Sequence, residues 1–221
     1  MEQKEIYVEL PKTRVKKNSV KHSKENALEK HEQLELIRAV STIKAQDTTK
    51  LKYRVLIALT MEAGLRISEA IQCRKEWFNT SEDGITINIP KDDRDNRNLK
   101  KNWTPKTEAG AREVIFLDAN VGSMVNTYFI TNPKGLEFSR QRAGQIVKAL
   151  GKLINKPDLH PHALRSTYAN NLVYQGVNTN TLCYCMGWSD LKTANNYVKT
   201  SKFAARKDLK EKFSKWLQKK I

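Results

Sequence analysis

One stretch, HPHALRSTYANNLVYQGVNTNTLCYCMGWSDLKTANNY over residues 160–197, constrains the fold more than any other part of the chain. Its prolines, glycines and small polar residues divide it into three short predicted helices joined by tight turns. The residues expected to start and stop these helices are Pro161, Gly176, Asn178 or Thr179, Gly187 and Ser189. Such a chain brings side chains from three helices to one place.

Four of those side chains indicate a phosphate as the target. His162 and Arg165 stand three residues apart, so they lie on one face of the first predicted helix. Trp188 follows the second helix and Tyr197 lies on the third. A basic pair, an indole and a phenol gathered at one site are typical of a protein that handles a phosphate group.

The charge of the whole chain points to a polyanion. Lysine and arginine outnumber the acidic residues by 40 to 24, which leaves a net charge of +16 over 221 residues. An ordinary solvated surface does not need so large an imbalance, so we expect nucleic acid as the partner. A membrane surface is the weaker alternative, because no long amphipathic basic stretch precedes the C-terminus.

The cysteines and the hydropathy pattern predict a soluble cytoplasmic protein. Cys73, Cys183 and Cys185 form no CxxC motif and no even framework, so we expect reduced thiols. Cys183 and Cys185 lie near His160 and His162, but the spacing is wrong for a zinc site, and we expect no metal or cofactor. No apolar run approaches the ~18 residues of a membrane span, and the chain opens without a signal-peptide core.

The remaining chain predicts an α+β fold that is mainly α, a helical bundle with a small antiparallel three-stranded sheet. Residues 1–26 carry many lysines and few apolar side chains, and we expect a basic arm or linker without stable structure. The predicted helices outside the central stretch cover residues 27–45, 50–62, 118–130, 139–155 and 203–220. The predicted strands cover residues 85–89, 101–104 and 112–117.

Two further features gain meaning only beside the central stretch. In GLRISE, Arg66 follows a predicted helix break, and Glu69 is placed to form a charge pair with it. Lys106 stands in a predicted hairpin turn, PKTEAG, between the last two strands. Surface ion pairs and hairpin lysines are common and by themselves carry little information.

As an ordered set, these residues resemble the tyrosine recombinases, the phage-integrase family of enzymes that break and rejoin DNA. The resemblance rests on GLRISE, the hairpin lysine, HALR at 162–165, GW at 187–188 and a tyrosine nine residues after the tryptophan. It covers the catalytic domain, residues 27–221. It implies Tyr197 as nucleophile, Arg66 and Arg165 as phosphate clamps, His162 as acid/base residue, Lys106 as the acid for the leaving 5′-oxygen, Glu69 as support of the first arginine, and Trp188 at a position that holds His or Trp in the family.

The chemistry of a phosphodiester agrees with those roles. Its transition state gathers charge on the non-bridging oxygens. Two arginines can donate several fixed hydrogen bonds to these oxygens and so stabilise the charge that a metal ion would otherwise stabilise. A tyrosine has an ordinary pKa of about 10, so a base such as His162 must help to remove its proton. A covalent protein–DNA link conserves the bond energy, so rejoining needs no ATP.

Several alternatives accompany this interpretation. Lys100, Lys101 and Arg112 are candidate substitutes for Lys106. A type IB topoisomerase shares the chemistry, although GLRISE and the spacing from GW to tyrosine favour a recombinase. A non-catalytic DNA-binding accessory protein is the third alternative, against which the intact set of residues argues.

The resemblance also implies how the protein engages its partners. Double-stranded DNA is the expected substrate, in the nucleoid or in the DNA of a host cell, during integration or excision of a mobile element or virus. About 26 residues before the first helix are too few for the family's separate core-binding domain, so we expect weak sequence specificity. The apolar stripe on helix 203–220 predicts docking on a neighbouring protomer, in dimers or tetramers on DNA, with docking on its own domain as the alternative.

Overall fold

Helices make up most of the described chain, and one small sheet completes it. The computed structural model describes residues 27–82, 84–91, 108–200, 209–210, 213–214, 216 and 218, without the side chains of residues 199–200. Within these ranges the chain forms two units. The first lies within residues 1–89 and 113–167, and the second within residues 90–112 and 168–221. The predicted arm at 1–26, the strand at 101–104 and Lys106 lie outside the described residues.

The fold agrees with the predicted α+β class. The α-helices are α1 (Lys30–Thr42), α2 (Asp47–Met61), α3 (Ile67–Gln72), α4 (Ala119–Thr131), α5 (Arg140–Leu153), α6 (Pro161–Tyr174), α7 (Thr179–Met186) and α8 (Leu191–Thr200). The 3₁₀ turns are η2 (Lys75–Trp77) and η3 (Glu108–Gly110), and the strands are β1 (Phe78–Ser81), β2 (Gly84–Ile89) and β3 (Arg112–Ile115).

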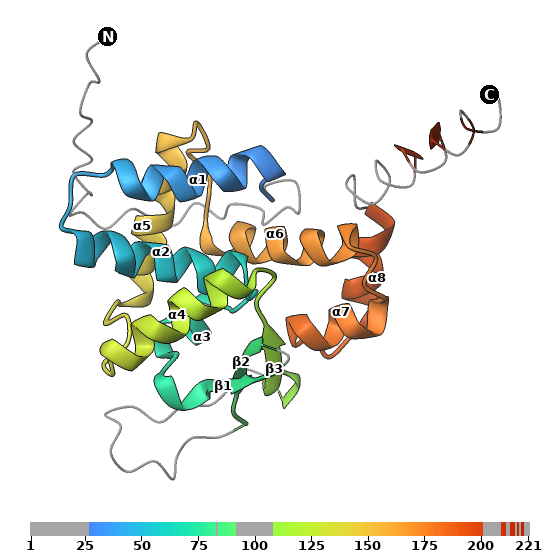
Figure 1. The fold of residues 1–221 in the computed structure, drawn as a ribbon. Coiled ribbons are helices and arrows are strands. Elements are labelled where there is room, and N and C mark those ends of the chain that lie inside the picture. The colour runs from blue at the N-terminus through green and yellow to red at the C-terminus, as the bar shows by residue number, and fades with distance from the viewer. Residues whose placement is uncertain are drawn as a thin grey trace. The chain divides into compact units, whose positions relative to one another are not determined.

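The first unit is built around α2, whose C-terminal half is buried. Helices α1, α3, α4 and α5 all pack against α2, and α1 also contacts α5 (Figure 1). The fully buried aliphatic and aromatic side chains of this core include Leu36, Val55, Leu56, Leu59, Met61, Phe129, Leu136 and Val147. Burial of so much apolar surface is the main force that holds these helices together.

The sheet has the order β1-β2-β3, and β1 pairs antiparallel with β2 from Phe78↔Ile87 to Ser81↔Gly84. Along β2, Ile87 and Ile89 are buried while Asn88 is exposed, so the alternation predicted for residues 85–89 is seen over residues 87–89, whereas Ile85 and Thr86 are both half-buried. The sequence did not predict β1, because its residues FNTS carry no apolar alternation and most of the strand is exposed. Its backbone pairing with β2 defines it.

The predicted third strand is shorter than expected. It ends at Ile115 and not at Leu117, because the chain turns there into α4. The N–H of Leu117 donates to the Glu62 carbonyl, and the Asp118 side chain caps α4 by accepting from the N–H groups of Asn120 and Val121. These hydrogen bonds hold the backbone from Leu117 to Val121 in the turn into α4, so β3 does not continue beyond Ile115.

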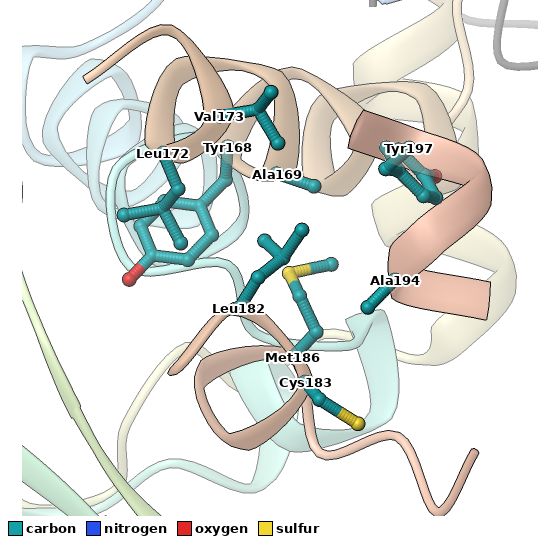
Figure 2. Close-up of a cluster of buried hydrophobic side chains, with 9 residues drawn as sticks. All are labelled: Tyr168, Ala169, Leu172, Val173, Leu182, Cys183, Met186, Ala194 and Tyr197. Atoms are coloured by element: carbon teal, nitrogen blue, oxygen red, sulfur yellow. The ribbon is translucent and has the colours of Figure 1, made fainter. Parts of the chain in front are cut away.

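The second unit has a hydrophobic core formed by side chains of three helices. Figure 2 shows the buried side chains that α6, α7 and α8 contribute to it, and α7 packs against α8. These residues are Tyr168, Ala169, Leu172, Val173, Leu182, Cys183, Met186, Ala194 and Tyr197. The cluster contains Tyr197, the predicted nucleophile, and thereby fixes where α8 holds it.

The turns between these helices follow the predicted signals with one exception. Gly176 and Gly187 both adopt left-handed backbone conformations, with φ of 85° and 54°, and Asn178 caps α7 by accepting from the Thr181 N–H. The prediction of Ser189 as the cap of α8 is wrong. The cap is Asp190, whose carboxylate accepts from the Lys192 N–H, so the helix begins at Leu191.

Across the described ranges, none of the helices combines the length and the apolar character that a membrane crossing requires.

Candidate active site

Arg66 and Glu69 form one local unit at the start of α3. Gly64, with φ of 65°, turns the chain after α2 and places Arg66 at the N-cap. Glu69 Oε2 accepts from the Arg66 backbone N–H at 2.7 Å, and Glu69 Oε1 lies 2.7 Å from Arg66 Nη1. One carboxylate therefore both caps the helix and binds the guanidinium, so local helix formation and the arginine's orientation are coupled.

Arg165 reaches the same carboxylate from α6. Its side chain is 4% exposed, its Nη1 donates to the Gly64 carbonyl, and it lies 3.6 Å from Glu69 Oε2. Glu69 itself is 1% exposed. Two guanidiniums thus share one buried carboxylate, and the three groups carry a net charge of +1. Such an arrangement favours binding of an anion, because positively charged hydrogen-bond donors are already held in place before the anion arrives.

The first turn of α6 carries His162, which is exposed, one turn before Arg165. The ring of His160 lies nearly parallel to that of His162, at 6° and with 6.3 Å between centroids. His160 Nδ1 accepts from the Ala163 N–H at 3.2 Å, so His160 serves as the N-cap of α6. This role was not predicted from the sequence, although the place of His160 just before Pro161 was a signal for it.

Trp188 and Tyr197 meet in the second unit. Their ring centroids are 5.0 Å apart with an interplanar angle of 30°, and Tyr197 is 4% exposed. The Trp188 backbone is held as well, because its N–H donates to the Cys183 carbonyl at 3.0 Å and its carbonyl accepts from Cys183 Sγ at 3.1 Å. Burial raises the pKa of the Cys183 thiol, which keeps the sulfur protonated and able to donate.

Lys106 and its candidate substitutes Lys100 and Lys101 lie outside the described residues. Arg112 is described, and its position argues against that role. It is 3% exposed, its Nε donates to the Cys185 carbonyl at 2.8 Å, and its Nη1 donates to the Gly110 carbonyl at 2.8 Å. These buried backbone contacts were not foreseen from the sequence.

The structure therefore brings the predicted residues together in two groups. Arg66, Glu69 and Arg165 meet in the first unit, and Trp188 and Tyr197 meet in the second. His162 lies on α6 with Arg165. Within the part of the chain that the structure describes, no group of three or more His, Cys, Asp or Glu side chains has a geometry that could hold a metal ion.

Comparison with known proteins defines the class. Residues 26–203 match the phage integrase family, and the chain belongs to that family. Tyrosine recombinase XerC of Staphylococcus aureus is 26% identical over 179 residues, which are 78% of this chain and 57% of the relative. The protein of strain USA300 / TCH1516 is 26% identical over 168 residues, 73% of this chain and 54% of the relative. The chain thus spans about half the length of the curated relatives it matches.

Solved structures share the fold. The crystal structure of XerA recombinase superposes with a TM-score of 0.62 at 17% identity, over 91% of this chain and 66% of that one. The integrase of transposon Tn1549 in complex with transposon right-end DNA gives 0.60 at 20% identity, over 84% and 65%. XerH site-specific recombinase bound to its difH substrate gives 0.57 at 17% identity, over 78% and 49%.

Proposed function

We propose that this protein is a tyrosine-type site-specific recombinase, which cleaves and rejoins double-stranded DNA through a covalent 3′-phosphotyrosine intermediate. The observation that carries the proposal is the placement of Arg66 and Arg165 on the shared carboxylate of Glu69. Family membership and the named activities of its relatives support it. The residues of the candidate site are those that the reaction requires.

In the proposed reaction, the two guanidiniums bind the non-bridging oxygens of the scissile phosphate. Arg66 is 23% exposed at its side chain, so a ligand can reach it, whereas Arg165 is held rigidly by Gly64 and Glu69. Because their orientation is fixed beforehand, little reorganisation is needed as charge grows on the oxygens. The clamps supply this charge without a metal ion, and the net +1 of the cluster favours the anion.

The covalent step exchanges one phosphoester for another. Tyr197 Oη attacks phosphorus and forms the 3′-phosphotyrosine, while the bond from phosphorus to the 5′-oxygen breaks. His162 accepts the phenol proton, and Lys106 donates a proton to the leaving 5′-oxygen. In rejoining, a 5′-hydroxyl attacks the phosphotyrosine and the protons return. Each step forms one phosphoester bond for the one that it breaks, so no ATP is consumed.

Trp188 supports the nucleophile by packing against it. The two rings pack with 5.0 Å between their centroids, and this packing restricts the rotation of the Tyr197 ring on α8. Its position corresponds by resemblance to one that holds His or Trp in the family. We assign to Trp188 the role of fixing the phenol ring for attack.

The substrate and the setting follow from the proposed reaction. The net charge of +16 suits the DNA backbone, and the XerH and Tn1549 integrase structures that share the fold are complexes with DNA. We assign residues 27–221 to the catalytic domain and residues 1–26 to a basic arm or linker. The protein would act in the cytoplasm, on the nucleoid or on host-cell DNA.

Self-association through the C-terminal helix is the remaining part of the proposal. Leu209, Phe213 and Trp216 are 55%, 61% and 51% exposed, and the rings of Phe213 and Trp216 pack edge to face with 6.4 Å between centroids. An apolar stripe of this kind gains stability when another surface covers it. We propose that a neighbouring protomer assembled on DNA provides that surface.

The decisive experiment is incubation with a nicked suicide duplex, followed by a denaturing gel. The wild-type protein should form a covalent DNA adduct and Tyr197→Phe should form none while still binding DNA. Tyr184→Phe, at an exposed tyrosine of α7, is the matched control and should react normally. Strand exchange between two sites, without relaxation of supercoils by monomers, then identifies a recombinase and not a topoisomerase. An adduct that persists in Tyr197→Phe would refute the assignment.

A further inference from the structure

A buried arginine outside the catalytic set connects two segments of the second unit. Arg112 is the first residue of β3, two residues after the end of η3, and it is 3% exposed. Its Nη1 donates to the Gly110 carbonyl and its Nε donates to the Cys185 carbonyl, both at 2.8 Å. A guanidinium is costly to bury, and an apolar side chain would fill the same space with less desolvation. We therefore expect the guanidinium to be buried for its hydrogen bonds to the Gly110 and Cys185 carbonyls.

The carbonyl of Cys185 belongs to the last turn of α7, where carbonyl groups lack partners within the helix. The helix ends in a left-handed turn at Gly187, where two further hydrogen bonds form. The Gly187 N–H donates to the Tyr184 carbonyl, and the Trp188 N–H donates to the Cys183 carbonyl. A cation at this end also opposes the partial negative charge of the helix C-terminus. Arg112 thus stabilises the turn from which Trp188 emerges.

Gly187 makes this contact close. Besides its φ of 54°, a Cβ at this position would lie 2.7 Å from the Ala109 carbonyl oxygen and 2.9 Å from Arg112 Nη1. The chain of η3 and the end of α7 therefore touch where only a glycine fits. Gly176 ends α6 with a similar backbone, φ of 85°, but a Cβ there would meet nothing within 4 Å.

We propose that Arg112 is a positioning residue for the nucleophile, which acts by locking the end of α7 so that Trp188 stays packed against Tyr197. The inference rests on the proposed function, because it makes the lock a requirement for attack by Tyr197. Arg112 does not touch the reacting atoms. In this proposal Arg112 holds the Cys185 carbonyl, and the held carbonyl stabilises the turn at Gly187. That turn keeps the Trp188 ring packed against the Tyr197 ring, with 5.0 Å between their centroids.

The first readout does not depend on catalysis. Hydrogen exchange of the amides in residues 183–188 should rise by about 10- to 100-fold in Arg112→Met, the range expected for the loss of a hydrogen bond from a charged group. Exchange within α5 should not change. Gly187→Ala should produce the same local increase. Gly176→Ala, the control at a second left-handed glycine with no contact for a Cβ, should leave residues 183–188 protected. Unchanged exchange at the end of α7 in both Arg112→Met and Gly187→Ala would overturn the lock.

The second readout is adduct formation on the suicide duplex at saturating protein. We expect Arg112→Met and Gly187→Ala to react about 10²-fold more slowly, the effect of a small misplacement of a reacting group, with DNA affinity nearly unchanged. Arg112→Lys should lie between wild type and Arg112→Met, because it keeps the cation but not the two-point fork. If Arg112→Met does not fold, Arg112→Lys and the two glycine variants carry the test.

A stability control separates positioning from general weakening. Val147→Ala removes buried volume from α5 without touching α7, and at equal loss of melting temperature it should react much faster than Arg112→Met. Equal rates in the two variants would overturn the positioning role. A wild-type protein that forms no adduct would refute the proposed function instead, and hydrogen exchange would still decide whether Arg112 locks the turn.

Discussion

The guanidinium of Arg165 lies 3.6 Å from the carboxylate of Glu69, although the two residues belong to different helices, α6 and α3. Both side chains are almost fully buried, at 4% and 2% exposure. Removing one partner of such a buried charge pair strongly destabilises the folded protein, because the other charge stays buried without compensation. The pair thus links the stability of the fold to the geometry of the candidate site.

Glu69→Gln should lower the free energy of unfolding by about 3–5 kcal/mol, because it leaves the buried guanidinium of Arg165 without its counter-charge. Denaturant unfolding measures the loss. Glu137→Gln is the control: Glu137 pairs with Lys52 at 3.3 Å but is 51% exposed, and the variant should lose less than ~1 kcal/mol. Equal losses in the two variants would show that Glu69 is no more than a surface partner.

Arg66→Ala and Arg165→Lys should each slow covalent adduct formation by about 10²–10³-fold, because each removes fixed hydrogen bonds to the developing charge on the phosphate. Equilibrium binding to the same duplex should change little, because the net charge of +16 provides many other cations to attract the DNA backbone. Arg38→Ala, at an exposed residue of α1, is the matched control for adduct formation. Parallel losses of binding and cleavage would identify the two arginines as ordinary phosphate contacts.

Cleavage should survive EDTA, because the two guanidiniums take the place of a metal ion as the electrophilic partner of the phosphate. The measurement is adduct yield with and without chelator, on the same suicide duplex. Loss of activity in EDTA that is restored by Mg²⁺ would contradict the proposed mechanism.

The pair of Glu32 and Lys156 should make stability depend on acid pH. Burial is the largest single influence and acts to raise the pKa of the Glu32 carboxyl. The hydrogen bonds from Lys156 and from the Glu29 backbone N–H, together with the positive charge of Lys156, outweigh it and leave the pKa below the usual 4.5. A lowered folded-state pKa contributes stability above about pH 4.5, and this contribution is lost as the pH falls through the folded value. Lys156 is 46% exposed, so the contribution is below ~1 kcal/mol.

Glu32→Gln isolates this charge, because glutamine can still accept the backbone N–H of Glu29 in the capping box of α1. The variant should be less stable than wild type at pH 7, and the difference should disappear near pH 3. Glu35→Gln, at an exposed position of the same helix, should show no such convergence. A stability difference that is constant across this pH range would contradict the assignment.

Deletion of residues 203–221 should abolish assembly on two DNA sites and strand exchange, because it removes the exposed stripe at Leu209, Phe213 and Trp216. Assembly is measured by gel shift and light scattering on paired sites, after far-UV circular dichroism has shown that the shortened protein is folded. The double variant Phe213→Ser and Trp216→Ser tests the stripe without shortening the chain. Normal strand exchange by both variants would disprove docking on a neighbouring protomer.

Local signals in the sequence predicted much of this structure. Pro161 at the start of α6, Asn178 at the start of α7 and the two left-handed glycines that end these helices are all confirmed. Each depends on backbone chemistry within four residues, which a sequence displays directly. The pairing of Arg66 with Glu69 belongs to the same class, because helical spacing brings the two side chains within reach.

Contacts across long separations could not be predicted in the same way. Arg165 and Gly64 are 101 residues apart, and Arg112 and Cys185 are 73 apart, yet each pair shares a hydrogen bond. In both pairs the acceptor is a backbone carbonyl, which every residue possesses and no residue type reveals. The sequence therefore predicted Arg165 as a phosphate clamp and left Arg112 as a candidate substitute for Lys106. The backbone carbonyls that these two arginines bind become visible only in the fold.

The capping box at the start of α3 gives the pair of Arg66 and Glu69 a fixed polarity. Glu69 accepts the Arg66 backbone N–H as well as its guanidinium, and a carboxylate in the first turn is favoured by the helix dipole, where a cation is disfavoured. Exchanging the two residues would conserve composition, net charge and spacing but reverse each of these interactions. An ion pair that involves side chains alone can form with its two residues in either order. This pair requires the arginine first and the glutamate three residues later.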